Sequence, residues 1–144
     1  VGNDLIKRGL PAVIKALEIL RNGHIHLAIA GNGKENVVNI PAELKNTIHF
    51  LGVVDNMIDL YQKADCLIHP TLVDTYGMAV LEAMSAKLPV IVSNKNYCGF
   101  AEHLNDEQAL ILENPKDEIE LSKMINLMFT DTSLREKITI NGFE

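Results

Sequence analysis

Apolar residues along the chain alternate between helical spacing and short continuous runs. A stripe at helical spacing, with a proline where the first turn of a helix tolerates one, predicts a first helix: Leu10, Pro11, Val13, Ile14, Leu17 and Leu20. The apolar run 25–30, closed by Gly31, has the length and the glycine punctuation of a strand. The sequence therefore predicts a helix followed by a strand in its first thirty residues.

The same alternation continues along the rest of the chain. Apolar runs predict further strands at 48–51, 66–68, 89–93 and 109–112. Helical patterns occupy the segments between and after them: one after a cap at Asp55, then 77–87, then 100–104, then one after Asp117. Asp117 and Glu120 form a capping-box pattern, and Asn141 with Gly142 is typical of a helix stop.

Short strands that alternate with helices predict parallel β-α-β units with right-handed crossovers. The expected fold class is α/β, a doubly wound, Rossmann-like parallel sheet with helices on both faces, in one domain over residues 1–144. Ligands of such sheets bind beyond the carboxyl ends of the strands. A site is therefore expected in the loops after Ala30, Leu51, Ile68 and Val92.

Composition narrows the class of protein. The chain has 144 residues, is 47% apolar and carries a formal charge of −6, so a complete core can form without disulfides. Cys66 lies in an apolar run and is interpreted as a small core residue, which favours the cytoplasm. The acidic balance disfavours nucleic acid as a partner. No apolar stretch approaches the roughly 20 residues of a membrane span, and peripheral attachment at the inner membrane face stays open.

Two patterns resemble ligand sites but do not complete them. At Gly31 to Lys34, a dinucleotide fingerprint would need glycine where Asn36 stands, and a P-loop would need serine or threonine where Glu35 stands. The pattern is left as a turn that either reverses the chain or permits a close backbone approach. His24 and His26 share one strand face, where a solvated pair is favoured over half a metal site. No metal ligand set is therefore predicted.

Residues 68–84 carry the most chemical information. A strand ends there, a loop carries Asp74, and a helix begins near Gly77. Free N–H groups at Gly77, Met78 and Ala79 would face an anion at the positive end of the helix dipole. Glu82, in the second turn, could accept hydrogen bonds from hydroxyl groups, or could be a surface charge on an amphipathic helix. The spacing favours a site for a sugar diphosphate.

These residues also carry a resemblance to a known family. The interval from Asp74 to Glu82, followed by 88–91, resembles the Glu-(seven residues)-Glu motif and the Gly-x-Pro-Val strand of retaining GT-B glycosyltransferases of the family-4 type. Residues 7–10, 28–31, 50–52 and 64–70 extend the resemblance over nearly all of the chain. Segments 2–9 and 97–101 are closest to the branch that adds glucose to the lipopolysaccharide core.

The resemblance implies a role for each matching residue. Lys7 and Arg8 would neutralise the diphosphate of a nucleotide sugar, and the backbone at Gly77, Met78 and Ala79 would bind phosphate or sugar. Glu82 would hold the ribose, Asp74 would contact the donor sugar, and backbone beside Val53 would hold the base. Arg8, Asp74 and Glu82 are the expected catalytic residues. Asp74 stands where the family usually has glutamate.

The activity implied is the retaining, metal-independent transfer of a hexose, such as glucose from UDP-glucose, to a hydroxyl of a glycan or lipid-linked acceptor. The chain would be the donor-binding half of a GT-B fold, with the acceptor-binding domain absent. We therefore expect it to bind donor weakly without turnover. Two alternatives stay open: a non-catalytic α/β module that binds phosphate or a partner, and half of a GT-B epimerase or phosphorylase.

Overall fold

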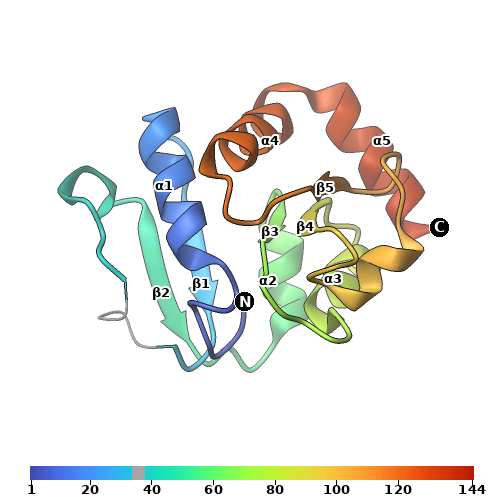
Figure 1. Cartoon of the computed structure of the whole chain (residues 1–144), viewed down its shortest axis with the longest axis horizontal. Coiled ribbons are helices and arrows are strands. Elements are labelled where there is room, and N and C mark those ends of the chain that lie inside the picture. The colour runs from blue at the N-terminus through green and yellow to red at the C-terminus, as the bar shows by residue number, and fades with distance from the viewer. Residues whose placement is uncertain (34–37) are drawn as a thin grey trace.

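The protein was analysed as a computed structural model, which describes residues 1–33 and 38–144. Helices and strands alternate along the chain, as the apolar pattern predicts (Figure 1). The elements, with η for a short 3₁₀ helix, are α1 Leu10–Leu20, β1 Leu27–Ala30, η2 Ala42–Leu44, β2 Ile48–Gly52, α2 Met57–Lys63, β3 Leu67–His69, α3 Met78–Ser85, β4 Val90–Ser93, η3 Gly99–His103, β5 Leu110–Leu112, α4 Glu118–Thr130 and α5 Thr132–Phe143.

Every strand pair in the described residues is parallel, which confirms the α/β class. The strands form two sheets, β1–β2 and β3–β4–β5, where a single sheet was expected. Their carboxyl ends lie at Ala30, Gly52, His69 and Ser93, within a residue of the predicted ends.

Helices cover both faces of the three-stranded sheet β3–β4–β5, and its central strand β4 shows this most directly. Ile91 faces a cluster built by α1, α4 and α5, whereas Val90 and Val92 face a second cluster built by α2 and α3. All four residues of β4 are buried because helices pack on both sides. In the described ranges, no helix has the length and the hydropathy that a membrane span needs.

Two helix caps differ from the prediction. The cap of α2 is Asn56, whose side chain accepts a hydrogen bond from the Asp59 N–H, and not Asp55. Asp117 caps α4 as expected, but Glu120 does not complete a capping box. Its carboxylate instead accepts the N–H groups of Glu113 and Asn114, because that loop has backbone donors of its own to satisfy.

The glycine turn after β1 permits a close backbone approach. A Cβ at Gly31 would lie 2.0 Å from the Gly2 carbonyl oxygen, and the Gly2 N–H donates to Ala30. The turn therefore packs one loop of this chain against another at the carboxyl edge of β1. The rest of the pattern that was set against the dinucleotide and P-loop motifs lies outside the described residues: Lys34, Glu35 and Asn36.

Candidate functional site

The Asp74 carboxylate lies at the centre of the loops beyond β3. Its Oδ2 accepts a hydrogen bond from His69 Nε2 at 2.9 Å and forms an ion pair with the Arg8 guanidinium at 2.5 Å. Its Oδ1 accepts the Gly77 N–H at 2.9 Å. One side chain thus joins the end of a strand, a basic loop and the start of α3.

Backbone contacts hold the same loops together. The Asp74 N–H donates to the Tyr97 carbonyl, and the Gly99 N–H donates to the Asp74 carbonyl. The Lys7 carbonyl accepts the Leu72 N–H at 2.7 Å. The loops at 2–9, 70–77 and 94–99 therefore form one connected structure around Asp74.

Burial and hydrogen bonding set the charges in this cluster. Desolvation lowers the pKa of His69, which is 1% exposed, to about 4, so the imidazole is neutral near neutral pH. Burial alone would raise the pKa of Asp74, but the Gly77 N–H, His69 and Arg8 together hold it below its ordinary value. Asp74 is therefore ionised, His69 donates from a protonated Nε2, and the Arg8 guanidinium is the cation paired with the carboxylate in the described residues.

The start of α3 offers fewer free donors than the sequence suggested. The Gly77 N–H is occupied by Asp74, which corrects the expectation of three free groups. The N–H groups of Met78 and Ala79 make no hydrogen bond among the residues that the structure describes, and they point out of the first turn. An anion at this helix start would meet these two donors beside Arg8.

The side chains of the other predicted residues lie outside this hydrogen-bonded cluster in the part of the chain that the structure describes. Glu82 is exposed in the second turn of α3, where its Oε2 accepts a hydrogen bond from the Tyr61 hydroxyl. Val53 is 65% exposed in the loop between β2 and α2. Lys7 points into solvent and pairs with Asp4 at 3.5 Å. Arg8 is thus built into the network, whereas the Lys7 side chain is free to move toward a ligand.

One cluster in the site has metal-ligand chemistry. The ligand atoms of His69, Asp74 and Cys98 lie within 4.8 Å of one another. Asp74 is already bonded to the Arg8 cation, and burial raises the pKa of the Cys98 thiol, which keeps it protonated. These contacts favour a hydrogen-bonded network over a metal site. On the distant sheet, His26 pairs with His49 across the strands at 2.9 Å, and not with His24.

Comparison with known proteins decides the family. The sequence profile described as "Glycosyl transferases group 1" matches residues 1–144. The chain belongs to this family.

Individual group 1 relatives agree with this assignment. Lipopolysaccharide glucosyltransferase WaaG of Escherichia coli is 28% identical over 142 residues, which cover 94% of this chain and 37% of WaaG. The uncharacterized glycosyltransferase MJ1607 of Methanocaldococcus jannaschii is 30% identical, covering 99% of this chain and 38% of its own length. The chain thus spans well under half of these relatives.

Solved structures show the same GT-B half. The crystal structure of WaaG, a glycosyltransferase involved in lipopolysaccharide biosynthesis, superposes with a TM-score of 0.86 at 26% identity, over 99% of this chain and 40% of that one. HepE of Anabaena, solved in complex with UDP and glucose, shares the fold with a TM-score of 0.85 at 20% identity, over 99% and 41% of the two chains.

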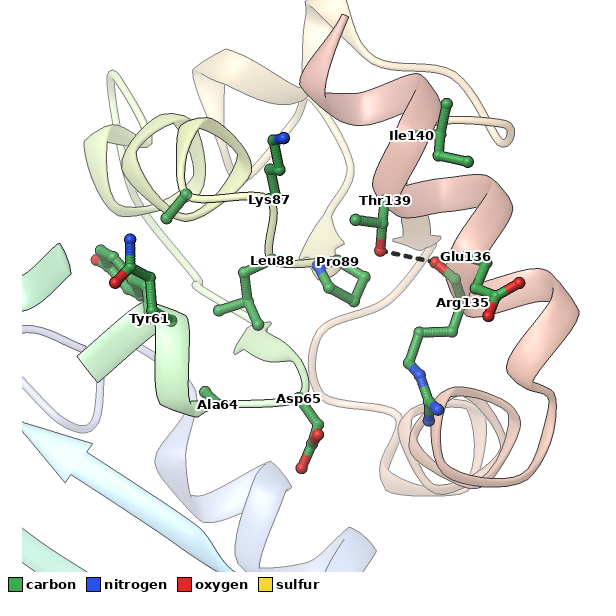
Figure 2. Close-up of a pocket in the computed structure, with 12 residues that line it drawn as sticks. Tyr61, Ala64, Asp65, Lys87, Leu88, Pro89, Arg135, Glu136, Thr139 and Ile140 are labelled. Atoms are coloured by element: carbon green, nitrogen blue, oxygen red, sulfur yellow. Dashed lines mark hydrogen bonds between the residues drawn. The ribbon is translucent and has the colours of Figure 1, made fainter. Parts of the chain in front are cut away.

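The group 1 domain also has a hollow of about 330 Å³ at the opposite edge of its strands (Figure 2). Asp65 and Pro89, which precede β3 and β4, line it together with Arg135 and Thr139 of α5. Ligands of doubly wound sheets bind at the carboxyl edge, so this hollow lies at the wrong end for the donor site.

The sequence did not reveal His69 as a member of the site. His69 directly follows the predicted strand 66–68, and its contact with Asp74 depends on how the loop after Pro70 folds back. A usable signal was present: a polar residue in an otherwise apolar strand end requires a buried partner. Asp74, five residues further on, is the first carboxylate that follows it.

The buried imidazole predicts a pH dependence of stability. An unfolded histidine binds a proton near its ordinary pKa of 6.5, whereas folded His69 binds one only near 4, so stability falls as pH drops between these values. His69→Gln keeps a neutral donor that does not titrate. Between pH 6.5 and 4, wild type should lose about 1 kcal/mol per pH unit more than this variant, by urea unfolding.

Equal slopes for the two proteins would contradict the assignment of a neutral, buried His69. Asp74 contributes in a separate pH range. Because the pKa of Asp74 is lowered in the folded protein, its contribution to stability is lost only as the pH falls below its ordinary value of 3.8.

Proposed function

We propose that this chain binds the nucleotide-sugar donor of a retaining glycosyltransferase. The donor is UDP-glucose or a similar hexose diphosphate nucleotide, and the hexose passes to a hydroxyl of a glycan or lipopolysaccharide acceptor. The observation that carries the proposal is the arrangement of the Arg8 guanidinium, the free N–H groups of Met78 and Ala79, and the Glu82 carboxylate along one edge of the fold.

Each group matches one part of such a donor. Arg8, Lys7 and the start of α3 meet the diphosphate, whose negative charge increases as it leaves the sugar. Fixed cations and N–H groups stabilise that charge, so the proposed reaction needs no metal. Glu82 accepts the ribose hydroxyls, and the backbone beside Val53 holds the base. Asp74 positions Arg8 and the helix start, and we place it against the donor sugar.

The relatives supply the class of donor and acceptor. WaaG is named for glucose transfer to lipopolysaccharide, and the HepE structure contains UDP and glucose. The chain covers 37–40% of WaaG, so we propose that acceptor binding and turnover require a further domain. We place the reaction in the cytoplasm, with peripheral attachment to the inner face of the membrane where the acceptor is lipid-linked.

Calorimetric titration of UDP and UDP-glucose into the chain tests this function. Wild type should bind both ligands. Arg8→Ala and Glu82→Ala should each make the free energy of UDP binding less favourable by about 1.5–3 kcal/mol, the range for hydrogen bonds to charged groups. Arg21→Ala and Glu136→Ala, exposed charges outside the site, are the matched controls and should bind as wild type does.

The outcomes also separate the alternatives. Binding of inorganic phosphate but of no nucleoside diphosphate at millimolar concentration would favour the non-catalytic module and reject the donor site. Product analysis of a full-length enzyme distinguishes a transferase from an epimerase or a phosphorylase, since only a transferase joins the hexose of the nucleotide sugar to a separate glycan or lipid acceptor.

A further inference from the structure

The Tyr61 side chain links the interior of the fold to the proposed ribose carboxylate. Tyr61 lies on α2, and it is 2% exposed and packed in the cluster that contains Val80 and Ala83 of α3. Its hydroxyl donates to Glu82 Oε2 at 3.2 Å. Figure 2 shows the side chain on α2, close to α3. A rigid, buried ring therefore ends on an exposed carboxylate of a neighbouring helix.

The direction of this hydrogen bond is fixed by chemistry. Burial, with the negative charge of Glu82, raises the pKa of Tyr61, so the phenol stays protonated and acts as the donor. An ionised carboxylate has about four acceptor positions, of which the phenol uses one. Among the described residues no other group bonds to this carboxylate, which leaves the remaining positions for other hydroxyl groups.

The contact also restricts the motion of Glu82. An exposed glutamate samples many rotamers and loses that freedom when it binds a ligand, at a cost of about 0.5–1.5 kcal/mol. Tyrosine has only two side-chain torsions, and here both are restricted by packing in the core. The phenol therefore holds the carboxylate in one place before any ligand arrives.

We propose that Tyr61 is a positioning residue that orients Glu82 to accept the vicinal 2′ and 3′ hydroxyls of a ribose. The inference rests on the proposed donor site and adds a source for its selectivity toward ribonucleotides. Tyr61 touches Glu82 and not the nucleotide, so its effect should depend on the hydroxyls that Glu82 binds.

The test compares two ligands and three proteins by calorimetry: UDP and 2′,3′-dideoxyuridine diphosphate with wild type, Tyr61→Phe and Tyr61→Leu. Tyr61→Phe keeps the ring but loses the hydroxyl, and its affinity for UDP should be about two- to tenfold lower than that of wild type. Its affinity for the dideoxy ligand should equal that of wild type. Tyr61→Leu also loses packing, and urea unfolding of each protein separates that loss from the effect on Glu82.

Each other result has a definite meaning. If Tyr61→Phe lowers the affinity for both ligands equally, or for neither, the positioning role is overturned while the donor site stands. If wild type binds UDP no better than the dideoxy ligand, Glu82 does not hold the ribose and the inference fails. If wild type binds neither ligand, the proposed function itself fails and this inference fails with it.

Discussion

Replacing Asp74 with asparagine should lower the free energy of unfolding by about 2–3 kcal/mol, because the amide cannot satisfy the partners of the carboxylate. The native Oδ2 accepts a hydrogen bond from His69 and forms an ion pair with Arg8, while Oδ1 accepts from Gly77. An amide has one acceptor oxygen, and its nitrogen would face a donor wherever it points. Arg8 would also lose the charge opposite it. Urea unfolding at pH 7 measures the change.

Asp4→Asn is the matched control for this prediction. Asp4 pairs with Lys7 at 3.5 Å, but these side chains are 50% and 67% exposed, and an exposed ion pair contributes little. The control should therefore leave the free energy of unfolding close to that of wild type. If the two variants were equally stable, Asp74 would not be the centre of the site. In Asp74→Asn, the Arg8 guanidinium is no longer held by a carboxylate. This variant should therefore also bind UDP more weakly than wild type, which calorimetry would measure.

Gly77→Ala should have a similarly large effect, for steric reasons. Gly77 has φ +67°, and a Cβ there would lie 2.7 Å from Cys98 Sγ and 2.9 Å from Phe100 Cβ. The left-handed conformation costs an alanine about 1–2 kcal/mol, and overpacking adds about 1–3 kcal/mol. Relief of the clash would move the Met78 and Ala79 N–H groups, so UDP affinity should fall with stability.

Comparison with Gly52→Ala isolates the steric part of that effect. Gly52 has the same φ of +67°, but nothing lies within 4 Å of a Cβ there. It should show the conformational cost alone, so Gly77→Ala should be less stable than Gly52→Ala by about 1–3 kcal/mol in urea. Equal losses for the two variants would mean that the α3 start adapts freely.

The elements that could be predicted are those defined by local patterns. The stripe from Leu10 to Leu20 matches α1 at both ends, because each of its determinants lies within the helix. The division into two sheets depends on pairing between distant segments. The start of α5 was not predicted, because among its residues only Ile138 is buried and no apolar stripe marks it. Asp131 caps it, a signal that is weak without such a stripe.

The site shows the same limit. The helix start at Gly77 and the position of Glu82 follow from local sequence. The pairing of Arg8 with Asp74 joins residues 66 positions apart, and no local pattern encodes it. The contact of the Tyr61 hydroxyl with Glu82 depends on the packing of α2 on α3, which the helical pattern after Asp55 does not encode. Roles that depend on loop packing therefore need the structure.

The network around Asp74 constrains how this position can vary between related proteins. Both carboxylate oxygens and both backbone polar groups of Asp74 are bonded, to His69 at the end of β3 and to partners in the loops at 2–9, 70–77 and 94–99. A glutamate is longer by one methylene, so its carboxylate would displace the His69 imidazole and the Arg8 guanidinium from their present positions. A change from aspartate to glutamate here therefore has to be accommodated by movement or substitution at positions 8 and 69.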